Sequence, residues 1–341
     1  MVANLGFGLY TVRLLFLQLA FTFVFIILPP KQGSYKMKAY QTLLYYKYTA
    51  IPDAEQFAIQ HLEFCERLGI VGRIIVASEG LNGTISGTVV QCKKYMDTVR
   101  LNPLFEGIEF KIDELDAPTF ERLYVRYKPE IVHSSLRGIK NIDPNKVTGI
   151  HLQPKEVDAI IDEQDVVFID VRSKYESGVG HFKNALKLDI DNFRDFPEQL
   201  KQLEHLKDKK VVTYCTGGIK CEKASGYLLS NGFKNVYQVD GGIVKYAKET
   251  GGKNFEGKLY VFDSRVVIDV NAVNPSIVSS CKICNAPSAH MVNCANAECN
   301  EHFVLCQACG TAMQGCCSTV CMQSPAKRVY DGSGYYQRGS E

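Results

Sequence analysis

The sequence carries little net charge. Its 341 residues include 39 Lys and Arg and 37 Asp and Glu, which leaves a formal charge of +2 at pH 7. The first 36 residues contain Arg13, Lys31 and Lys36 and no acidic residue, so the remainder of the chain is close to neutral. Bulk charge therefore does not indicate a nucleic-acid partner, although a local basic patch on a neutral surface could still bind one.

The sequence also lacks a convincing membrane span. The apolar run from Leu14 to Leu28 has about fifteen residues, whereas a helix that crosses a bilayer needs roughly twenty. A signal-peptide core would suit that length, but no small-residue cleavage site follows, because the chain continues with Pro29, Pro30 and Lys31. Residues 1–36 form an apolar leader that is either an anchor or translated sequence upstream of a start at Met37. We favour the second interpretation and expect no stable membrane partner.

The composition has neither the polar excess of a disordered chain nor the apolar excess of a polytopic membrane protein. Charged residues make up 22% of the chain and hydrophobic residues 46%. The length suits two or three domains, each large enough to bury a core.

Thirteen cysteines raise the question of disulfides, but their distribution favours metal binding. Nine of them lie between Cys281 and Cys321, as four closely spaced pairs and one further cysteine. Because a disulfide framework would also fit poorly with reactive thiols elsewhere in the chain, we expect a reducing, cytoplasmic location.

Residues 37–148 read as strands and helices in the order β-α-β-β-α-β, a ferredoxin-like α+β plait. The expected strands are Thr42–Tyr48, Arg73–Ala77, Thr84–Ser86 and Ile108–Ile112. The expected helices are Ala54–Leu68, for which Asp53 is a candidate N-cap, and Val89–Leu101. We predict a turn over Glu79-Gly80-Leu81-Asn82-Gly83. This plait occurs in proteins of many functions, so it predicts none by itself.

Residues 149–252 predict a second domain of parallel βαβ units. The expected strands are Gly149–Leu152, Val166–Asp170, Val211–Tyr214 and Val236–Val239, and the expected helices are Asp195–Leu206, Cys221–Asn231 and Gly242–Lys248. In such sheets the functional site lies beyond the carboxyl ends of the strands, where Asp170 and Cys215 fall.

The segment that follows the strand ending at Tyr214 has the pattern of a reactive-cysteine loop. Its residues are Cys215-Thr216-Gly217-Gly218-Ile219-Lys220, and Cys221 opens the next predicted helix. Two glycines let successive N–H groups point toward the sulfur, and the helix N-terminus and Lys220 add positive charge, so Cys215 should ionise readily. An inert buried cysteine before an ordinary glycine turn is the alternative. The combination of strand end, double glycine, helix and cation favours a nucleophile.

This second domain resembles the rhodanese domain. The resemblance rests on the loop and on landmarks in the expected order: Asp170-Val171-Arg172, Tyr175-Glu176, Gly180-His181-Phe182 with Ala185, and Asp240-Gly241-Gly242. In rhodaneses the active-site loop runs from the catalytic cysteine to a basic residue five positions later, a length that suits sulfur. The loop of the related phosphatases is one residue longer. The loop from Cys215 to Lys220 has the shorter length. We interpret Asp170 and Arg172 as a scaffold ion pair and His181 as a structural support, rather than as catalytic groups.

The string from Cys215 to Ser225, the turn from Glu79 to Gly83 and the cysteine-rich tail together resemble the bacterial tRNA uridine(34) hydroxylase family over residues 37–325. The resemblance implies oxygen-dependent hydroxylation of C5 of the wobble uridine, U34, with Cys215 as the essential cysteine, molecular oxygen as co-substrate and the tRNA anticodon loop as partner. Lys220 stands where the family usually has Arg, which keeps the charge but loses the planar fork.

The chemistry of the loop remains open at the level of sequence. Attack of the Cys215 sulfur on C6 of the uracil would make C5 electron-rich, so that oxygen could be delivered there; a persulfide on Cys215 is the rhodanese-type alternative. Cys221 is either a resolving thiol or a cysteine without chemistry. The rival functions are a sulfurtransferase and a non-enzymatic, zinc-stabilised scaffold.

The cysteine-rich region, residues 253–325, predicts two structural zinc sites of four thiolates each. One set is Cys281, Cys284, Cys306 and Cys309, and the other is Cys294, Cys299, Cys317 and Cys321. His302 or Cys316 could replace one member of the second set. Residues 326–341 lack a pattern and are expected to form a disordered tail. The predicted fold class is therefore α/β, with a ferredoxin-like domain, a rhodanese-type parallel-sheet domain and a cysteine-rich zinc-binding segment.

Overall fold

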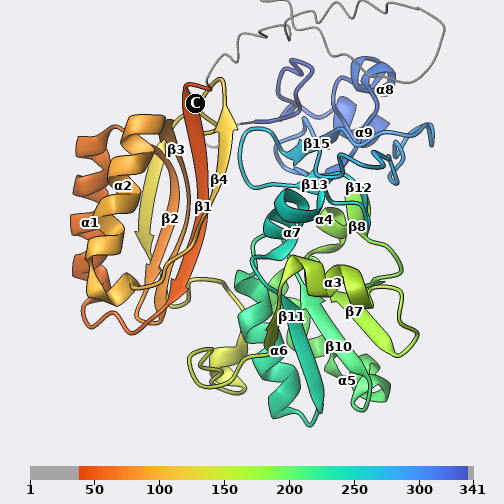
Figure 1. Ribbon diagram of the computed structural model, residues 1–341. Helices are drawn as coiled ribbons and strands as arrows, with labels where there is room; N and C mark the ends of the chain where they lie inside the picture. The colour runs from red at the N-terminus through yellow and green to blue at the C-terminus, as the bar shows by residue number, and fades with distance from the viewer. Residues whose placement is uncertain (1–37, 337–341) are drawn as a thin grey trace, which may run out of the picture. The chain divides into compact units, whose positions relative to one another are not determined.

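The computed structural model of the protein describes residues 38–336 (Figure 1). The predicted leader, residues 1–36, and the last five residues of the predicted tail lie outside the described residues. Between residues 38 and 336, no helix combines the length and the apolar character needed to cross a membrane.

The first domain is a five-stranded sheet with the order β4-β1-β3-β2-β5. Its strands are β1 (Tyr40–Tyr48), β2 (Val71–Ala77), β3 (Gly80–Thr88), β4 (Phe110–Leu115) and β5 (Leu123–Tyr127), and its helices are α1 (Ala54–Leu68), α2 (Val89–Leu101) and the short η1 (Pro103–Phe105). The first four strands have the order of the ferredoxin-like plait, which confirms that prediction. Strand β5 was not predicted; it pairs with β2 in parallel.

Helices α1 and α2 cover one face of this sheet (Figure 1). Strand β1 alternates, so that Leu43 and Tyr45 enter the core beneath the helices while Leu44 and Tyr46 are less buried and point to the opposite face. Asp53 caps α1 as predicted, and its carboxylate accepts a hydrogen bond from the backbone N–H of Gln56 at 3.0 Å. The open face of the sheet is therefore free to meet another part of the chain.

One turn in this domain differs from the prediction. Strand β3 begins at Gly80, so Leu81, Asn82 and Gly83 belong to a strand, and the turn comprises only Ser78 and Glu79. The φ of Gly80 is +147°, and a Cβ there would lie 2.1 Å from the Lys47 carbonyl oxygen. The glycines that suggested a turn are needed instead for close approach between strands.

The central domain is a parallel sheet with the order β6-β11-β10-β7-β9. Its strands are β6 (Ile150–Leu152), β7 (Val166–Asp170), β9 (Leu186–Lys187), β10 (Lys210–Tyr214) and β11 (Asn235–Val239), and its main helices are α3 (Pro154–Ile160), α4 (Lys174–Val179), α6 (Ile219–Ser230) and α7 (Gly242–Thr250). Val211 packs into one apolar core and Val212 into another, so the sheet is buried on both faces. This arrangement confirms the predicted parallel-sheet domain.

One helix prediction in this domain was wrong. The expected helix Asp195–Leu206 is a chain of short pieces, η3 (Phe193–Gln199), α5 (Leu200–Leu203) and η4 (Glu204–Leu206), with Pro197 inside the first. Proline lacks a backbone donor, which disfavours a regular α-helix. The predicted helix Cys221–Asn231 is confirmed as α6, although it begins at Ile219, so Ile219 and Lys220 are its first residues.

The C-terminal region consists of short elements. They are β12 (Phe255–Gly257), β13 (Leu259–Tyr260), β14 (Val267–Ile268), β15 (Met291–Asn293), β16 (His302–Val304), α8 (Gln307–Ala312) and α9 (Thr319–Met322). Strand β12 pairs with β8 (Gly180–Phe182) of the central domain. The short η2 (Leu136–Gly138), which precedes the central domain, completes the described elements.

The prediction of a disordered tail from residue 326 was wrong for residues 326–336. The backbone of Lys327 bridges to Asn296, and the Arg328 guanidinium donates hydrogen bonds to the carbonyl oxygens of Cys294 and Ala295. The Arg328 guanidinium also lies 3.9 Å from the centre of the Tyr336 ring. This segment packs against the cysteine-rich region, a contact between distant residues that local composition does not reveal.

Candidate active site

The predicted cysteine loop lies at the carboxyl end of β10, between β7 and β11. The backbone N–H of Ile243 donates to the carbonyl oxygen of Cys215, and that of Val244 to Thr216, so the start of α7 holds the loop. Gly242 makes this possible, because a Cβ at that position would lie 2.5 Å from the Cys215 carbonyl oxygen. The loop is thus fixed by the first turn of the neighbouring helix.

The Cys215 sulfur is directed into the loop and is almost fully buried. The backbone N–H of Gly218 donates to it at 3.2 Å. Burial acts to raise the pKa of Cys215, but a hydrogen bond from the Cys221 thiol, the charge of Lys220 and the N–H groups of Lys220 and Gly218 outweigh it and lower the pKa to about 6. At neutral pH this cysteine is a thiolate, which is the nucleophilic form.

Lys220 is held beside the loop by a carboxylate. Its ammonium group lies 2.8 Å from the carboxylate of Glu176 on α4 and 5.6 Å from the centre of the Phe262 ring. Burial acts to lower the pKa of Lys220, but the charges of Glu176 and Cys215 and the hydrogen bond to Glu176 together outweigh it, so the pKa is raised. Lys220 therefore stays charged next to Cys215.

Cys221 lies in the first turn of α6 and is completely buried. Burial and the neighbouring Cys215 sulfur raise its pKa well above the ordinary value. The two cysteines thus form an unequal pair, a thiolate and a thiol within hydrogen-bond reach of each other. That pairing is compatible with a resolving role.

The predicted supporting residues make structural contacts. Arg172 donates two hydrogen bonds to the Asp170 carboxylate, at 2.9 and 2.6 Å, and a third to the carbonyl oxygen of Gly180; the side chains of Arg172 and Asp170 are fully buried. A ring nitrogen of His181 lies 2.9 Å from the carbonyl oxygen of Ser177. These contacts brace the segment between β7 and β8.

The open face of the first domain covers the loop, which sequence reasoning missed. A Cβ on Gly217 would lie 2.8 Å from Leu44, and a Cβ on Gly218 would lie 2.9 Å from the Tyr46 hydroxyl, so both glycines allow close approach of β1. The Tyr46 hydroxyl donates to Glu222 on α6 at 2.9 Å. In the sequence, the only sign of this role is that side chains of a strand alternate between its two faces, which places Leu44 and Tyr46 on one face of β1. The alternation does not reveal which part of the chain that face contacts.

Lys111 on β4 is a further cation near the loop. Its ammonium group lies 5.1 Å from the centre of the Tyr46 ring, and burial lowers its pKa although Glu109, Asp240 and Cys215 act in the opposite direction. Lys111 also lines a cavity of about 500 Å³ together with Leu44, Thr216 and Phe262. We call this space the loop cavity. The Thr216 hydroxyl is buried and has no hydrogen-bond partner among the described residues.

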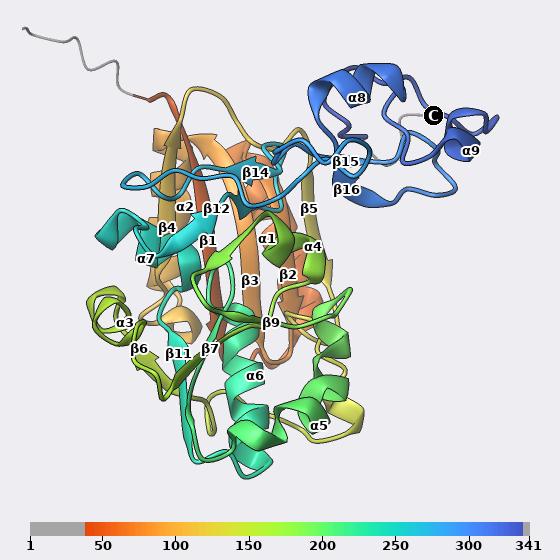
Figure 2. The ribbon, with the colours of Figure 1, turned by 90° about the vertical axis from the view of Figure 1, so that its right-hand side faces the viewer.

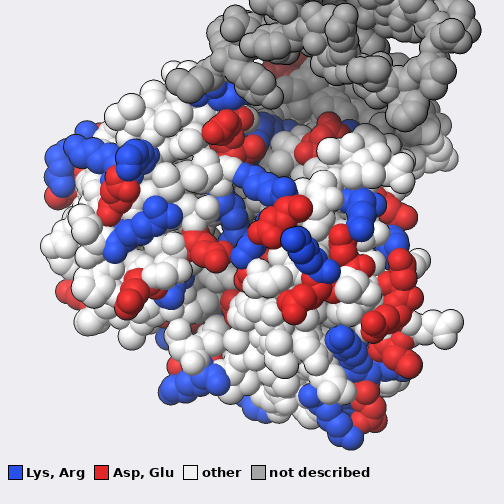
Figure 3. Space-filling view, in the orientation of Figure 1, with Lys and Arg blue, Asp and Glu red and all other residues white. Residues whose placement is uncertain are grey.

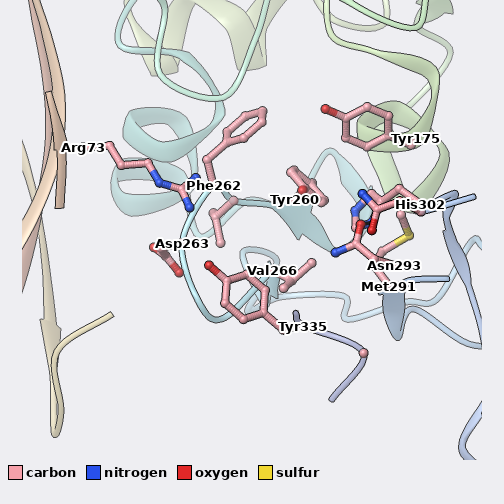
Figure 4. Close-up of a pocket in the computed structure, with 13 residues that line it drawn as sticks. Arg73, Tyr175, Tyr260, Phe262, Asp263, Val266, Met291, Asn293, His302 and Tyr335 are labelled. Carbon is pink, nitrogen blue, oxygen red and sulfur yellow. Dashed lines mark hydrogen bonds between the residues drawn. The ribbon is translucent and has the colours of Figure 1, made fainter. Parts of the chain in front are cut away.

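A second, smaller cavity of about 280 Å³ lies on the other side of Phe262. Figure 4 shows its aromatic lining, in which the rings of Tyr175, Tyr260 and His302 lie 5.2 to 5.3 Å from one another. Arg73 reaches it from the first domain (Figure 4). We call this space the aromatic cavity. Because Tyr175 adjoins Glu176, it lies next to the residue that holds Lys220.

The structure brings the eight predicted metal-ligating cysteines into two groups of four. They are Cys281, Cys284, Cys306 and Cys309, and Cys294, Cys299, Cys317 and Cys321, and within each group the sulfurs lie within 4.8 Å of one another. The Cys284–Cys306 and Cys299–Cys317 sulfur distances are 3.7 and 3.6 Å. A tetrahedral site with Zn–S bonds of about 2.3 Å requires sulfurs about 3.8 Å apart, so both groups fit zinc.

The two residues considered as substitutes lie outside the second group. The Cys316 thiol faces the Gln314 carbonyl oxygen, and the His302 ring contacts Asn293 and the two tyrosines of the aromatic cavity. Within the described residues 38–336, none of the thirteen cysteines forms a disulfide.

Three segments of the chain match known protein families. Residues 40–131 match the family described as UPF0176 acylphosphatase like domain, residues 153–249 match the Rhodanese-like domain, and residues 256–322 match the family described as Rhodanase C-terminal. Among solved structures, a rhodanese-like domain protein from Staphylococcus aureus is 24% identical, covers 28% of this chain and 90% of its own, and has a TM-score of 0.25.

Curated relatives match along most of the chain. The tRNA uridine(34) hydroxylase of Cytophaga hutchinsonii is 58% identical over 302 residues, which are 89% of this chain and 96% of the relative. That of Bacillus cereus is 45% identical over 294 residues, covering 85% of this chain and 92% of the relative. With this identity over all three regions, the chain belongs to the tRNA uridine(34) hydroxylase family.

Proposed function

We propose that this protein hydroxylates C5 of uridine 34 in tRNA, with Cys215 as the nucleophile and molecular oxygen as the oxidant. Family membership supports the substrate, and one observation carries the assignment of Cys215: its sulfur, with a pKa of about 6, is a thiolate held by the N–H of Gly218 and the charge of Lys220. The loop cavity beside Thr216 is the space we assign to the uracil ring.

The thiolate begins the reaction by adding to C6 of the uracil. A C–S bond forms, the C5–C6 π bond breaks, and its electron pair moves toward the C4 carbonyl oxygen, so that C5 becomes nucleophilic. C5 then forms a bond to one atom of dioxygen, and the other oxygen atom takes up a proton, which gives a hydroperoxide on C5. Loss of the proton on C5 then expels the Cys215 thiolate and restores the ring. Lys220 stabilises the thiolate before addition and after expulsion.

The overall reaction needs two electrons in addition to oxygen. Uridine, dioxygen, two electrons and two protons give 5-hydroxyuridine and water. The freed Cys215 thiolate attacks the outer oxygen of the hydroperoxide and breaks the O–O bond, which leaves 5-hydroxyuridine and a sulfenic acid on Cys215. The Cys221 thiol then displaces water from the sulfenic acid to form a disulfide, which a cellular thiol reduces. The two sulfurs thus supply both electrons, the Cys221 thiol supplies one proton and the solvent supplies the other. Cys221 is placed for this role because it lies within hydrogen-bond reach of Cys215.

Zinc has an architectural role in this proposal. The two groups of cysteines would hold two ions and stabilise a segment with a small apolar core, and they include neither Cys215 nor Cys221. The partner is the anticodon loop of tRNA, and the protein acts in the cytoplasm, where tRNA and reduced thiols occur together.

Nucleoside mass spectrometry of tRNA tests the proposal. A strain without the gene is complemented with the wild type, with Cys215→Ala or with Cys92→Ala, a buried cysteine of the first domain that serves as the control. We expect 5-hydroxyuridine derivatives with the wild type and the control and none with Cys215→Ala. Loss of thiolated nucleosides instead would indicate a sulfurtransferase, and unchanged tRNA would indicate a scaffold.

A further inference from the structure

We infer that a basic groove beside the aromatic cavity binds single-stranded RNA and leads it to the Cys215 loop. The groove is a space of about 870 Å³ between β2, β5 and the C-terminal region. Among the described residues that line it, the cations are Arg73, Arg122, Arg126, Lys128 and Arg328, and the one carboxylate is that of Glu121. We call it the basic groove. This inference rests on the proposed function for the identity of the RNA.

Four cations of the basic groove are available to phosphate. Arg73, Arg122, Arg126 and Lys128 are exposed, and none of them takes part in an ion pair between described residues. By contrast, Lys and Arg alternate with Asp and Glu on the face shown in Figure 3. A cluster of unpaired cations on a nearly neutral protein is a site for a polyanion.

Aromatic side chains lie between these cations. Tyr124, Tyr260 and Tyr335 line the basic groove, and the Arg126 guanidinium lies 4.9 Å from the centre of the Tyr124 ring. Unpaired bases stack on aromatic rings and on guanidinium planes, whereas duplex RNA is bound through phosphates and 2′-hydroxyls. The combination therefore favours a single strand, as in an anticodon loop, over a duplex.

The basic groove lies next to the aromatic cavity, on the side toward the Cys215 loop. Arg73, Tyr260 and Tyr335 line both this groove and the aromatic cavity, so the two spaces adjoin each other. The aromatic cavity reaches Phe262, whose ring lies beside Lys220 and also lines the loop cavity. A strand bound in the groove can thus place one flipped base next to Cys215.

Strand β5 and the residues that flank it, Arg122 and Lys128, supply most of the charge of the groove. The strand lies at the edge of the sheet, next to the cysteine-rich region in Figure 2, and Arg126 and Tyr124 project from it. The C-terminal wall comes from Tyr335 and from Arg328, which is held by the backbone around Cys294. The zinc-binding region and the segment after it therefore serve the substrate by forming one side of its binding surface.

Binding of a synthetic RNA hairpin with the anticodon-loop sequence, measured by fluorescence anisotropy at several salt concentrations, tests the inference. We expect Arg122→Gln/Arg126→Gln to weaken binding about tenfold or more and to reduce the salt dependence, since each phosphate contact on a single strand contributes a slope of about 0.7. A blunt RNA duplex of equal length should bind the wild type more weakly than the hairpin does.

The matched control is Lys93→Gln/Lys94→Gln, which removes the same charge from exposed positions of α2. Equal loss of affinity in this control, or unchanged affinity and salt slope in the arginine variant with an unchanged thermal midpoint, would overturn the inference. Arg122→Lys/Arg126→Lys, which keeps the charge, should retain most of the binding and reports on the groove if the glutamine variant fails to fold.

Hydroxylation is measured separately in the same samples. If the RNA binds in the groove but no 5-hydroxyuridine forms, the proposed reaction is wrong and the groove stands. If 5-hydroxyuridine forms equally in the wild type and in the arginine variant at limiting RNA, the groove is wrong and the reaction stands.

Discussion

The ammonium group of Lys223 lies 2.6 Å from the carboxylate of Glu130, and both side chains are almost completely buried. Lys223 belongs to α6, the helix that begins in the cysteine loop, whereas Glu130 follows the last strand of the first domain. Glu79, from the turn between β2 and β3, contacts the same ammonium group at 2.8 Å. One buried cation thus ties the first domain to the helix of the active site.

Replacing Lys223 with Met should therefore be strongly destabilising. The change leaves two carboxylates beside an apolar side chain, and breaking a buried ion pair costs about 3–5 kcal/mol. Urea unfolding of the variant is the measurement. Lys234→Met is the control: Lys234 forms an exposed pair with Asp208, so its loss should leave the midpoint unchanged. Equal midpoints for the two variants would mean that the buried pair does not hold the domains together.

The acidity of Cys215 should depend on Lys220. The thiolate is present above a pKa of about 6 and is lost as the pH falls through that value, and removing the cation raises the pKa. In Lys220→Met the ultraviolet absorbance of the thiolate should therefore appear at higher pH, by about one unit or more, whereas Lys220→Arg should titrate like the wild type. Cys215→Ala supplies the blank. A titration unchanged in Lys220→Met would assign the low pKa to the backbone N–H groups alone.

Cys221 should be needed for turnover and not for the first addition to uracil. We expect Cys221→Ser to form 5-hydroxyuridine at most once per enzyme molecule in single-turnover assays and to fail in multiple turnover, because serine cannot form the disulfide. Quantitative mass spectrometry of the product against enzyme concentration measures this. Full multiple turnover by the variant would remove Cys221 from the mechanism and leave it as a buried residue of α6.

Metal analysis should find two zinc ions per chain, one for each group of cysteines. Cys281→Ser/Cys309→Ser should reduce this to one and expose the C-terminal region to hydrogen exchange, because metal binding contributes directly to folding in such segments. Cys316→Ser is the matched control, since Cys316 is buried beside these groups and belongs to neither. Loss of zinc in the control would show that the ligand set differs.

Gly218 should not tolerate a side chain. Its φ is +101°, and a Cβ would lie 2.9 Å from the Tyr46 hydroxyl, so Gly218→Ala combines backbone strain of about 1–3 kcal/mol with a steric conflict. We expect loss of hydroxylation and a raised pKa of Cys215, because the Gly218 N–H would move. Gly138→Ala, at a position with no atom within 4 Å of the new Cβ, should be neutral. Normal activity of Gly218→Ala would show that the loop is not held in this conformation.

Features that depend on neighbours in sequence could be predicted. Helices α1 and α2 have the predicted bounds because their apolar spacing and caps are local properties. The cysteine loop was found for the same reason, since a strand end, two glycines and a cation stand within a few residues. The two groups of cysteines follow from ligand spacing, which restricts how pairs can share an ion.

The structure also shows why some predictions failed. Pro197 interrupts the expected helix, the glycines of β3 serve strand contacts instead of a turn, and Arg328 orders part of the expected tail by contacts with Cys294 and Ala295. In the last two cases a partner far away in the chain decides the conformation, and single-sequence patterns do not contain the partner.

The amino-acid sequence by itself determined the two domains of helices and strands, the loop of the proposed nucleophile Cys215 and the cysteine spacing that suits zinc. Only the tertiary structure decided that Leu44 and Tyr46 cover the loop, that Glu176 and Phe262 flank Lys220, and that β5 forms the basic groove with the C-terminal region. The physical reason is that a loop's conformation and acidity arise from adjacent residues, whereas a binding surface arises where separate faces of the folded chain meet.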